Sequence, residues 1–207
     1  MDPAEFRQAR SRGAFVYVVA CRADNRFKIG FSRDPEDRWR TLHRRYFEFF
    51  DLERGALVAA ARVADARRLE RALLDAFAPY QSLAPLEVPL AAAGHTEWFR
   101  GALDEAVELA GEHARAHGLD RRRPGDWLRE VYGARVDRVF GWSAALFDAV
   151  EYERENPCAG TGSAPAVRIE RALRDALDAF GSLGFDVRGA LRADVAAWYA
   201  RDGGASA

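Results

Sequence analysis

Four polar side chains stand in segments whose patterns otherwise predict buried strands and helices: Tyr17, Lys28, Arg38 and Glu70. A carboxylate can bind a divalent metal ion, which polarises a phosphoryl oxygen and stabilises the leaving alkoxide of a phosphodiester. A guanidinium matches the charge that develops on the phosphate, and a phenol beside a cation can activate water. These residue types therefore suit phosphodiester cleavage. The residues alone leave an alternative open, in which Tyr17 is a core aromatic, Arg38 is solvated and Glu70 forms a surface ion pair.

Lysine is almost absent from the chain, because 30 of its 31 basic residues are arginine and Lys28 is the exception. Arginine is a planar fork that stays charged, whereas lysine is a compact point charge whose pKa can be shifted. The position of Lys28 is therefore expected to need the smaller cation, unless one lysine codon survived by chance. If Lys28 lies beside Tyr17, it is expected to lower the pKa of the phenol.

The first two of these side chains fall on a predicted β-hairpin. The apolar run AFVYVVAC at residues 14–21 predicts a strand that carries Tyr17. Residues 22–26 predict a tight turn, and FKIGF at residues 27–31 predicts the returning strand, which carries Lys28. The hairpin would bring the two side chains near each other.

The third side chain falls on a predicted helix. Asp34 followed by Pro35 is typical of a helix start, because aspartate caps the free N–H groups and proline fits the first turn. The spacing of the apolar residues continues this helix to about Tyr46. Arg38 would then lie one turn into the helix.

The rest of the amino-terminal half alternates between strand and helix patterns. Residues 56–63 predict a third strand, and the apolar stripe over residues 66–78 predicts a helix that carries Glu70. A proline-rich loop over residues 79–96 separates it from a further helix at about residues 99–117. The expected order is β-β-α-β-α-α around a small three-stranded sheet.

The carboxyl-terminal half predicts helices alone. Arg121 to Gly125 reads as a linker, and helices are predicted at about 125–132, 134–154, 165–181 and 187–201. The fold class is therefore α+β, a three-stranded sheet flanked by helices and followed by an all-helical region. We place the domains at residues 1–118 and 119–207.

Composition and charge exclude several classes of protein. The net charge is −1, but residues 1–50 carry an excess of basic side chains, which weakly indicates an anionic partner. Apolar runs are too short to span a membrane, and the polar start MDPAEFRQARSRG is unlike a secretory signal. Two cysteines, Cys21 and Cys158, form no disulfide framework, so a cytoplasmic location is expected.

The order and spacing of these segments resemble the GIY-YIG nuclease superfamily, in the phage and bacterial branch whose second motif reads KIG. The resemblance covers about residues 14–101. It rests on Phe15-Val16-Tyr17, Lys28-Ile29-Gly30, Ser32, Asp34-Pro35, Arg38, Leu42, the helix segment Arg68 to Leu74, and Glu97-Trp98-Phe99.

The resemblance implies a role for each matching residue. Tyr17 would be the general base or a phenol that orients water, with Lys28 beside it on the hairpin. Gly30 would allow the backbone to approach the site closely. Arg38 would bind the scissile phosphate, and Glu70 would be the one protein ligand of the metal ion, with water completing its shell.

Other positions match the branch less closely. Glu97 matches the acid of the closing motif, whose role would be to fix a loop or to assist the site. The branch commonly has a histidine where this chain has Leu74 and an arginine where it has Gln81, which puts activity in question more than fold. His43 and His95 lie near the motifs and are candidates to replace the missing histidine.

We therefore expect a divalent-metal-dependent DNA endonuclease with Mg²⁺ or Mn²⁺ as its cofactor. The alternatives are a DNA-binding module of the same fold without catalysis, and a protein-interaction module. The helical region is expected to bind a protein partner or a second copy of the chain. The residues expected to contact DNA are Lys28, Arg33, Arg38 and Arg40.

Overall fold

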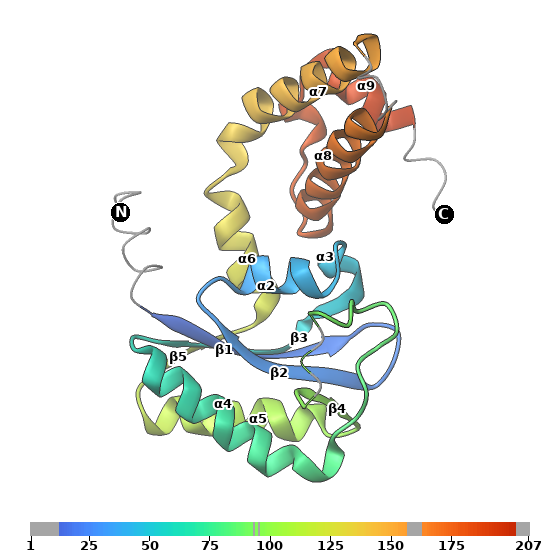
Figure 1. The fold of residues 1–207 in the computed structure, drawn as a ribbon. Coiled ribbons are helices and arrows are strands. Elements are labelled where there is room, and N and C mark those ends of the chain that lie inside the picture. Colours follow the sequence, from blue (N-terminus) through green and yellow to red (C-terminus); the bar gives the residue numbers. More distant parts are fainter. Residues whose placement is uncertain (1–12, 93, 95, 157–162, 202–207) are drawn as a thin grey trace. The chain divides into compact units, whose positions relative to one another are not determined.

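The computed structural model describes residues 13–92, 94, 96–156 and 163–201 (Figure 1). The chain divides into two compact units, Met1–Leu128 and Arg129–Ala207. The boundary expected at residue 118 falls before a strand and the first turn of a helix that belong to the first unit. Each unit is described below by itself.

The first unit is built on one antiparallel sheet of five strands in the order β4-β2-β1-β3-β5. The strands are β1 (Ala14–Cys21), β2 (Arg26–Ser32), β3 (Phe50–Ala60), β4 (Trp98–Arg100) and β5 (Asp120–Arg122). The expectation of three strands is wrong because β4 and β5 are only three residues long, too short to show a periodic pattern. The linker expected at Arg121 to Gly125 in fact begins as the edge strand β5, which pairs with β3.

The third strand begins earlier than its apolar pattern suggests. The first half of β3 lacks an apolar strand pattern because it contains the polar residues Asp51, Glu53 and Arg54. The sequence therefore predicts only the apolar second half of the strand. The pairing with β1 shifts between Val19 and Ala20, which is the mark of a β-bulge. Gly55 lies at this shift with φ +140°, where a Cβ would meet the carbonyl oxygen of Val18.

Helices cover both faces of the sheet (Figure 1). They are α2 (Pro35–Leu42), α3 (Tyr46–Phe49), α4 (Val63–Phe77) with the 3₁₀ turn η1 (Ala78–Tyr80), and α5 (Leu103–Ala116). α4 and α5 close a core on one face, to which β1 gives Val16 and Val18. Side chains alternate along a strand, so Tyr17 between them points to the opposite face, where α2 lies.

Helix α2 begins where the sequence predicts, but it ends early. Asp34 caps it by accepting a hydrogen bond from the backbone N–H of Asp37 at 3.2 Å, and Pro35 occupies the first turn. The helix ends at Leu42, and His43 takes an extended conformation before α3 starts at Tyr46. The single helix expected over this stretch is therefore two helices.

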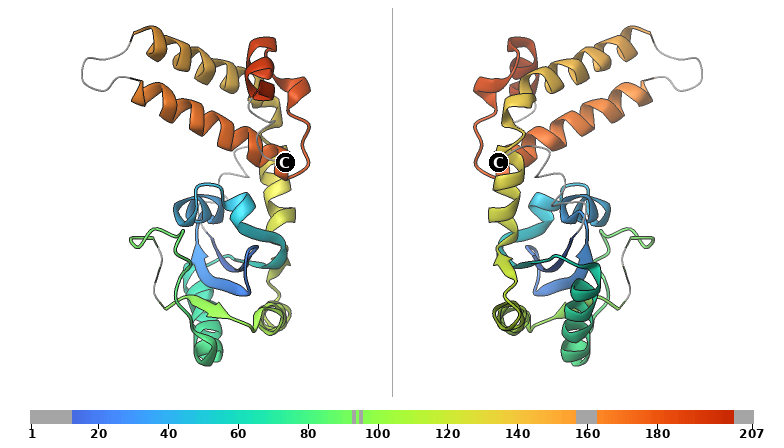
Figure 2. Two further views of the ribbon diagram at one scale, coloured as in Figure 1. Left: turned by 90° about the vertical axis from the view of Figure 1, so that its right-hand side faces the viewer. Right: turned by 90° about the vertical axis from the view of Figure 1, so that its left-hand side faces the viewer.

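The described part of the second unit is helical, as the sequence predicts. Its elements are the end of α6 (Pro124–Gly133), η2 (Val136–Arg138), α7 (Val139–Glu155), α8 (Ala164–Ser182), η3 (Arg188–Ala190) and α9 (Ala193–Arg201). α7 and α8 lie side by side as a hairpin (Figure 2). Trp198 of α9 anchors them, because its indole N–H donates to Glu170 at 2.8 Å and Arg174 lies 4.5 Å from its ring centroid. Among the described residues, no helix is long and apolar enough to cross a membrane.

Candidate active site

Tyr17 lies flat over a glycine on the neighbouring strand. β1 and β2 pair so that Tyr17 stands opposite Gly30, and a Cβ built on Gly30 would lie 2.6 Å from the phenol oxygen. The ring also packs edge-on against Trp39 of α2, with 5.9 Å between centroids. Only 1% of the Tyr17 surface is exposed. The expected function of Gly30, to permit close approach, has this geometric basis.

Arg38 is the cation that contacts this phenol. Its charge acts on the Tyr17 phenol more strongly than that of any other side chain, and its Nη2 donates to the carbonyl oxygen of Ala92 at 3.0 Å. Burial raises the pKa of Tyr17 well above its usual range, and the charge of Arg38 opposes this shift only in part. The sequence argument assigned the lowering of the phenol pKa to Lys28, and the geometry assigns it to Arg38.

Lys28 is fully buried and pairs with a residue far along the chain. Its Nζ lies 2.6 Å from Oε2 of Glu97 and 5.2 Å from the ring centroid of Trp98. The lysine side chain is 0% exposed, whereas that of Glu97 is 29% exposed. Burial lowers the pKa of Lys28, and the carboxylate of Glu97 opposes this. Glu97 therefore holds the lone lysine of the chain in its charged form.

Glu70 reaches the same region from the opposite face of the sheet. It lies on α4, and the backbone N–H of Phe31 on β2 is near enough to its carboxylate to favour the charged form. This N–H is available because the pairing of β4 with β2 stops at Lys28 and leaves the end of the strand open. Burial raises the pKa of Glu70, and the nearby charge of Glu97 raises it further.

The four residues expected from the sequence thus meet at the open end of the β2 edge. Lys28 and Arg38 approach from the face that α2 covers, and Glu70 comes around the edge from α4. The charges of Glu70 and Glu97 both act on the buried Tyr17, so the five groups share one electrostatic environment.

The carboxylates of this edge, Glu70 and Glu97, are of the ligand type that a divalent ion prefers. Mg²⁺ is commonly held by one or two carboxylates, with water and substrate phosphate completing its octahedron. The charge of Glu97 raises the pKa of Glu70, and a cation between the two carboxylates would offset this repulsion. Across the described ranges, no group of three or more His, Cys, Asp and Glu side chains could hold a metal ion, so a shell of protein ligands alone is not available.

The remaining expected site residues lie farther from this centre. Arg33 is exposed at the end of β2, whereas Arg40 is held by Glu36, with 2.5 Å between Nη2 and Oε1. His43 stacks on Phe49 at 4.6 Å between centroids, and the structure shows no contact between it and the four site residues. His95 lies outside the described residues.

The two departures from the expected motifs have structural roles. Leu74 packs against the core beneath the sheet, where a histidine would be poorly placed. Gln81 forms a β-bridge with Phe99 and so extends the edge next to β4. The sequence argument missed the contact of Ala92 with Arg38 and the position of Arg67 beside Phe31, although the spacing of Arg67, three residues before Glu70 on one helix face, could have indicated the latter.

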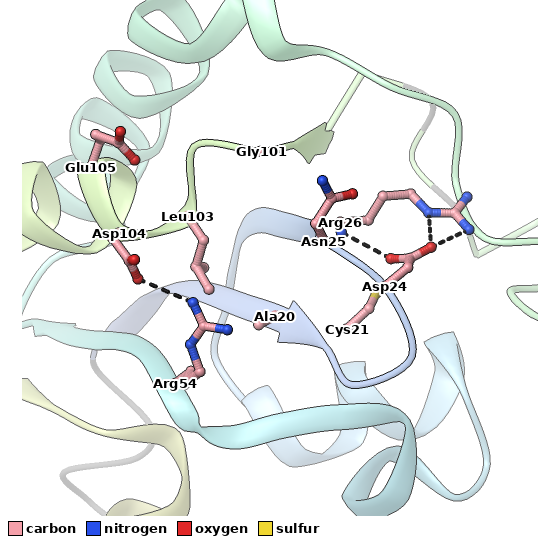
Figure 3. A pocket seen from close by; sticks show the side chains of 10 residues that line it. All are labelled: Ala20, Cys21, Asp24, Asn25, Arg26, Arg54, Gly101, Leu103, Asp104 and Glu105. Carbon is pink, nitrogen blue, oxygen red and sulfur yellow. Dashed lines mark hydrogen bonds and ion pairs between the residues drawn. The ribbon is translucent and has the colours of Figure 1, made fainter.

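A pocket of about 230 Å³ lies away from this centre, between the ends of β1 and β3 and the start of α5 (Figure 3). Four of its five charged groups form two ion pairs, and the fifth is Glu105. Arg54 lies 3.2 Å from Asp104, and Arg26 lies 2.5 Å from Asp24. None of the four side chains that meet at the β2 edge lines this pocket.

Comparison with known proteins gives one match. Residues 14–113 match the family model of the T5orf172 domain, a range that includes the whole β2-edge site. No curated protein and no solved structure matches the chain.

This match corrects the family expected from the motifs. The matching model is that of the T5orf172 domain, a distinct family, so the assignment to the GIY-YIG superfamily is wrong. The similarity to the T5orf172 domain indicates a nuclease-like or DNA-binding role for this part of the chain.

Proposed function

We propose that the β2-edge site hydrolyses phosphodiester bonds of DNA with Mg²⁺ or Mn²⁺. The observation that carries this proposal is the meeting of Arg38 and Glu70. The guanidinium comes from the α2 face and the carboxylate from the α4 face, and both act on the same buried phenol of Tyr17. A cation for the phosphate and a carboxylate for a metal ion then flank one strand edge. The match of residues 14–113 to the T5orf172 domain supports the same role.

The proposed mechanism uses a single metal ion held by Glu70, with Glu97 as the nearest second carboxylate. When bound, this ion would polarise the phosphate and stabilise the leaving alkoxide. Arg38 donates its hydrogen bonds to the scissile phosphate in place of the carbonyl oxygen of Ala92. A water molecule attacks phosphorus, its proton passes to solvent, and the bond to the leaving oxygen breaks.

Tyr17 acts in this mechanism as an oriented phenol rather than as the general base. Its raised pKa keeps the proton on the phenol near neutral pH, so Tyr17 would act from its buried position on Arg38 and not as a base toward water. Lys28 acts through Glu97, because its own side chain is fully buried. Its charge would fix the direction of that carboxylate beside the metal ion.

The test is nicking of supercoiled plasmid by wild type and by Glu70→Gln. We expect wild type to nick only with Mg²⁺ or Mn²⁺, to stop with EDTA, and to recover when metal is restored. Glu70→Gln should lose the activity, whereas Asp75→Asn, an exposed acid on the same helix, should retain it. Equal cleavage by wild type and Glu70→Gln would refute the proposal.

One observation favours a second candidate, a DNA-binding module without turnover. Tyr17 is buried and Arg38 is already bound to the carbonyl oxygen of Ala92, so the cation is occupied in this conformation. This candidate predicts DNA binding that weakens steeply with salt, without cleavage under any metal. Under both candidates the partner is DNA and the location is the cytoplasm. We further propose that the helical unit binds a protein partner or a second copy.

A further inference from the structure

One phenylalanine on β2 links Glu70 to an arginine that the site has not yet used. The backbone N–H of Phe31 favours the charged form of the Glu70 carboxylate, and the ring of Phe31 lies beneath the guanidinium of Arg67. The distance from the guanidinium carbon to the ring centroid is 5.4 Å, within the range of a cation–π contact. Arg67 and Glu70 are three residues apart on α4, so they share one helix face.

The guanidinium of Arg67 is exposed, and within the described chain no ion pair engages it. A ring beneath the plane of a guanidinium fixes its orientation and leaves the N–H groups at its edge available. The charge of Arg67 also lowers the pKa of Glu70, so the two groups act on each other without forming an ion pair. Arg67 is thus an oriented cation without an ion-pair partner among the described residues, on the same helix face as Glu70, the proposed metal ligand. This arrangement suits a polyanion that contacts Arg67 and also reaches a metal ion at Glu70.

We propose that Arg67 binds the DNA phosphate next to the scissile one and positions the strand along the β2 edge. This inference rests on the proposed function and adds a substrate-positioning residue to it. Arg67 touches no reacting atom, so it should affect binding of the strand more than the chemical step. The Phe31 ring sets the direction of the guanidinium, and the Phe31 N–H sets that of Glu70, so one residue fixes the distance between the two contacts.

The neighbouring Arg68 supplies a matched control. It has the same residue type and helix, but it points to a different side and lies 3.5 Å from Asp65. Arg67→Ala and Arg68→Ala therefore remove the same charge from adjacent positions. Thermal unfolding of both variants checks that each remains folded.

The first measurement is duplex DNA binding without metal, over a range of salt concentrations. For Arg67→Ala we expect affinity to fall about 3- to 10-fold at 0.1 M salt. The slope of log affinity against log salt should decrease by about 0.9, the value for one lost phosphate contact. Arg68→Ala should keep the wild-type slope. In steady-state cleavage with Mg²⁺, Arg67→Ala should raise KM and leave kcat within about twofold.

A second variant tests the role of the ring. Phe31→Leu keeps an apolar side chain against the core but removes the surface beneath the guanidinium. It should reproduce part of the Arg67→Ala loss in affinity, and the double variant should lose less than the sum of the two. Arg67→Lys should restore the salt slope but not the full affinity, because lysine keeps the charge and loses the fork.

The outcomes distinguish a failure of this inference from a failure of the proposed function. If wild type cleaves DNA and Arg67→Ala matches Arg68→Ala in slope and KM, the inference is overturned and the proposed function stands. A loss confined to kcat would also overturn it. If wild type neither binds nor cleaves DNA, the proposed function fails, and the inference fails with it.

Discussion

The phenol of Tyr17 occupies the space that any side chain at Gly30 would need. A Cβ on Gly30 would lie 2.6 Å from the phenol oxygen and 2.8 Å from Cζ of the same ring. The ring cannot swing aside, because Trp39 packs against it and its surface is buried. The smallest residue on β2 therefore determines where the phenol, and with it Arg38, is placed.

Gly30→Ala should destabilise the first unit and impair cleavage. The added methyl group must displace a buried ring, and overpacking of this kind costs about 1–3 kcal/mol of unfolding free energy. Urea unfolding monitored by tryptophan fluorescence measures the loss. Gly111→Ala on α5 is the control, because its nearest neighbour would be a flexible arginine at 3.4 Å, and alanine favours the helix by up to about 1 kcal/mol. Equal stability of Gly30→Ala and wild type would contradict the packing described.

Removal of Glu97 should destabilise the protein more than removal of Lys28. Glu97→Ala leaves a fully buried ammonium without the carboxylate at 2.6 Å, a change that costs about 3–5 kcal/mol in buried pairs. Lys28→Met leaves a carboxylate that is 29% exposed and can be hydrated. Thermal unfolding of both variants at pH 7 should therefore give the lower Tm for Glu97→Ala. The reverse order would show that the pair is less buried than its geometry indicates.

Lys28→Arg should be poorly tolerated although it keeps the charge. The Nζ atom is enclosed by Glu97 and Trp98, and a Cβ on Gly94 would already lie 3.2 Å from it. A longer and planar guanidinium must turn the Glu97 carboxylate away from the edge. We expect a folded protein with most of the cleavage activity lost. Wild-type activity would instead favour chance as the reason for the lone lysine.

Arg38→Ala should reduce cleavage by about 10²–10³-fold, the effect of losing one preorganised charged donor. The side chain is only partly buried, and its contact with Ala92 is one hydrogen bond, so Tm should stay within a few degrees of wild type. Initial rates of plasmid nicking and a thermal unfolding curve test the two parts. A collapse in stability would assign Arg38 a structural role.

Cys21 should not react with thiol reagents in the folded protein. Burial raises the pKa of its thiol to about 12, so the reactive thiolate is scarce at pH 8. In a Cys158→Ser background, labelling by iodoacetamide should be slow in native buffer and should become rapid in urea. A rise from pH 7 to pH 9 should increase this slow native rate, because below the pKa the reactive thiolate fraction grows about tenfold per pH unit. Fast native labelling would show that the end of β1 opens readily.

The local pattern of the sequence was sufficient for the elements that carry the site. β1 begins and ends where its apolar run does, and α2 starts at the predicted cap. The order of Tyr17, Lys28, Arg38 and Glu70 along the chain also predicted that they would meet. The element bounds depend on neighbours in sequence or on a repeated apolar spacing, whereas the meeting of the four residues was implied only by the motif order.

The contacts that refine the site could not be predicted in this way. Glu97 pairs with Lys28 across 69 positions, and Ala92 meets Arg38 across 54. Local propensity carries no information on such separations. β5 consists of Asp120, Arg121 and Arg122, so no apolar residue indicated a strand. For the same reason, the sequence argument wrongly expected Lys28 to be the cation that acts on the Tyr17 phenol. Only the register of β1 against β2 shows that Tyr17 faces Gly30 and not Lys28.

The position of Glu70 beside the backbone N–H of Phe31 also bears on self-association. An open strand edge offers unpaired N–H groups to a strand of another molecule. Beyond β4, the N–H of Ile29 donates to the carbonyl oxygen of Glu97, and the Glu70 carboxylate acts on the N–H of Phe31. The carboxylate thus covers the last open position of β2. Glu70→Ala would expose the backbone N–H of Phe31. A variant made to abolish cleavage would therefore also present an unpaired strand edge that favours aggregation.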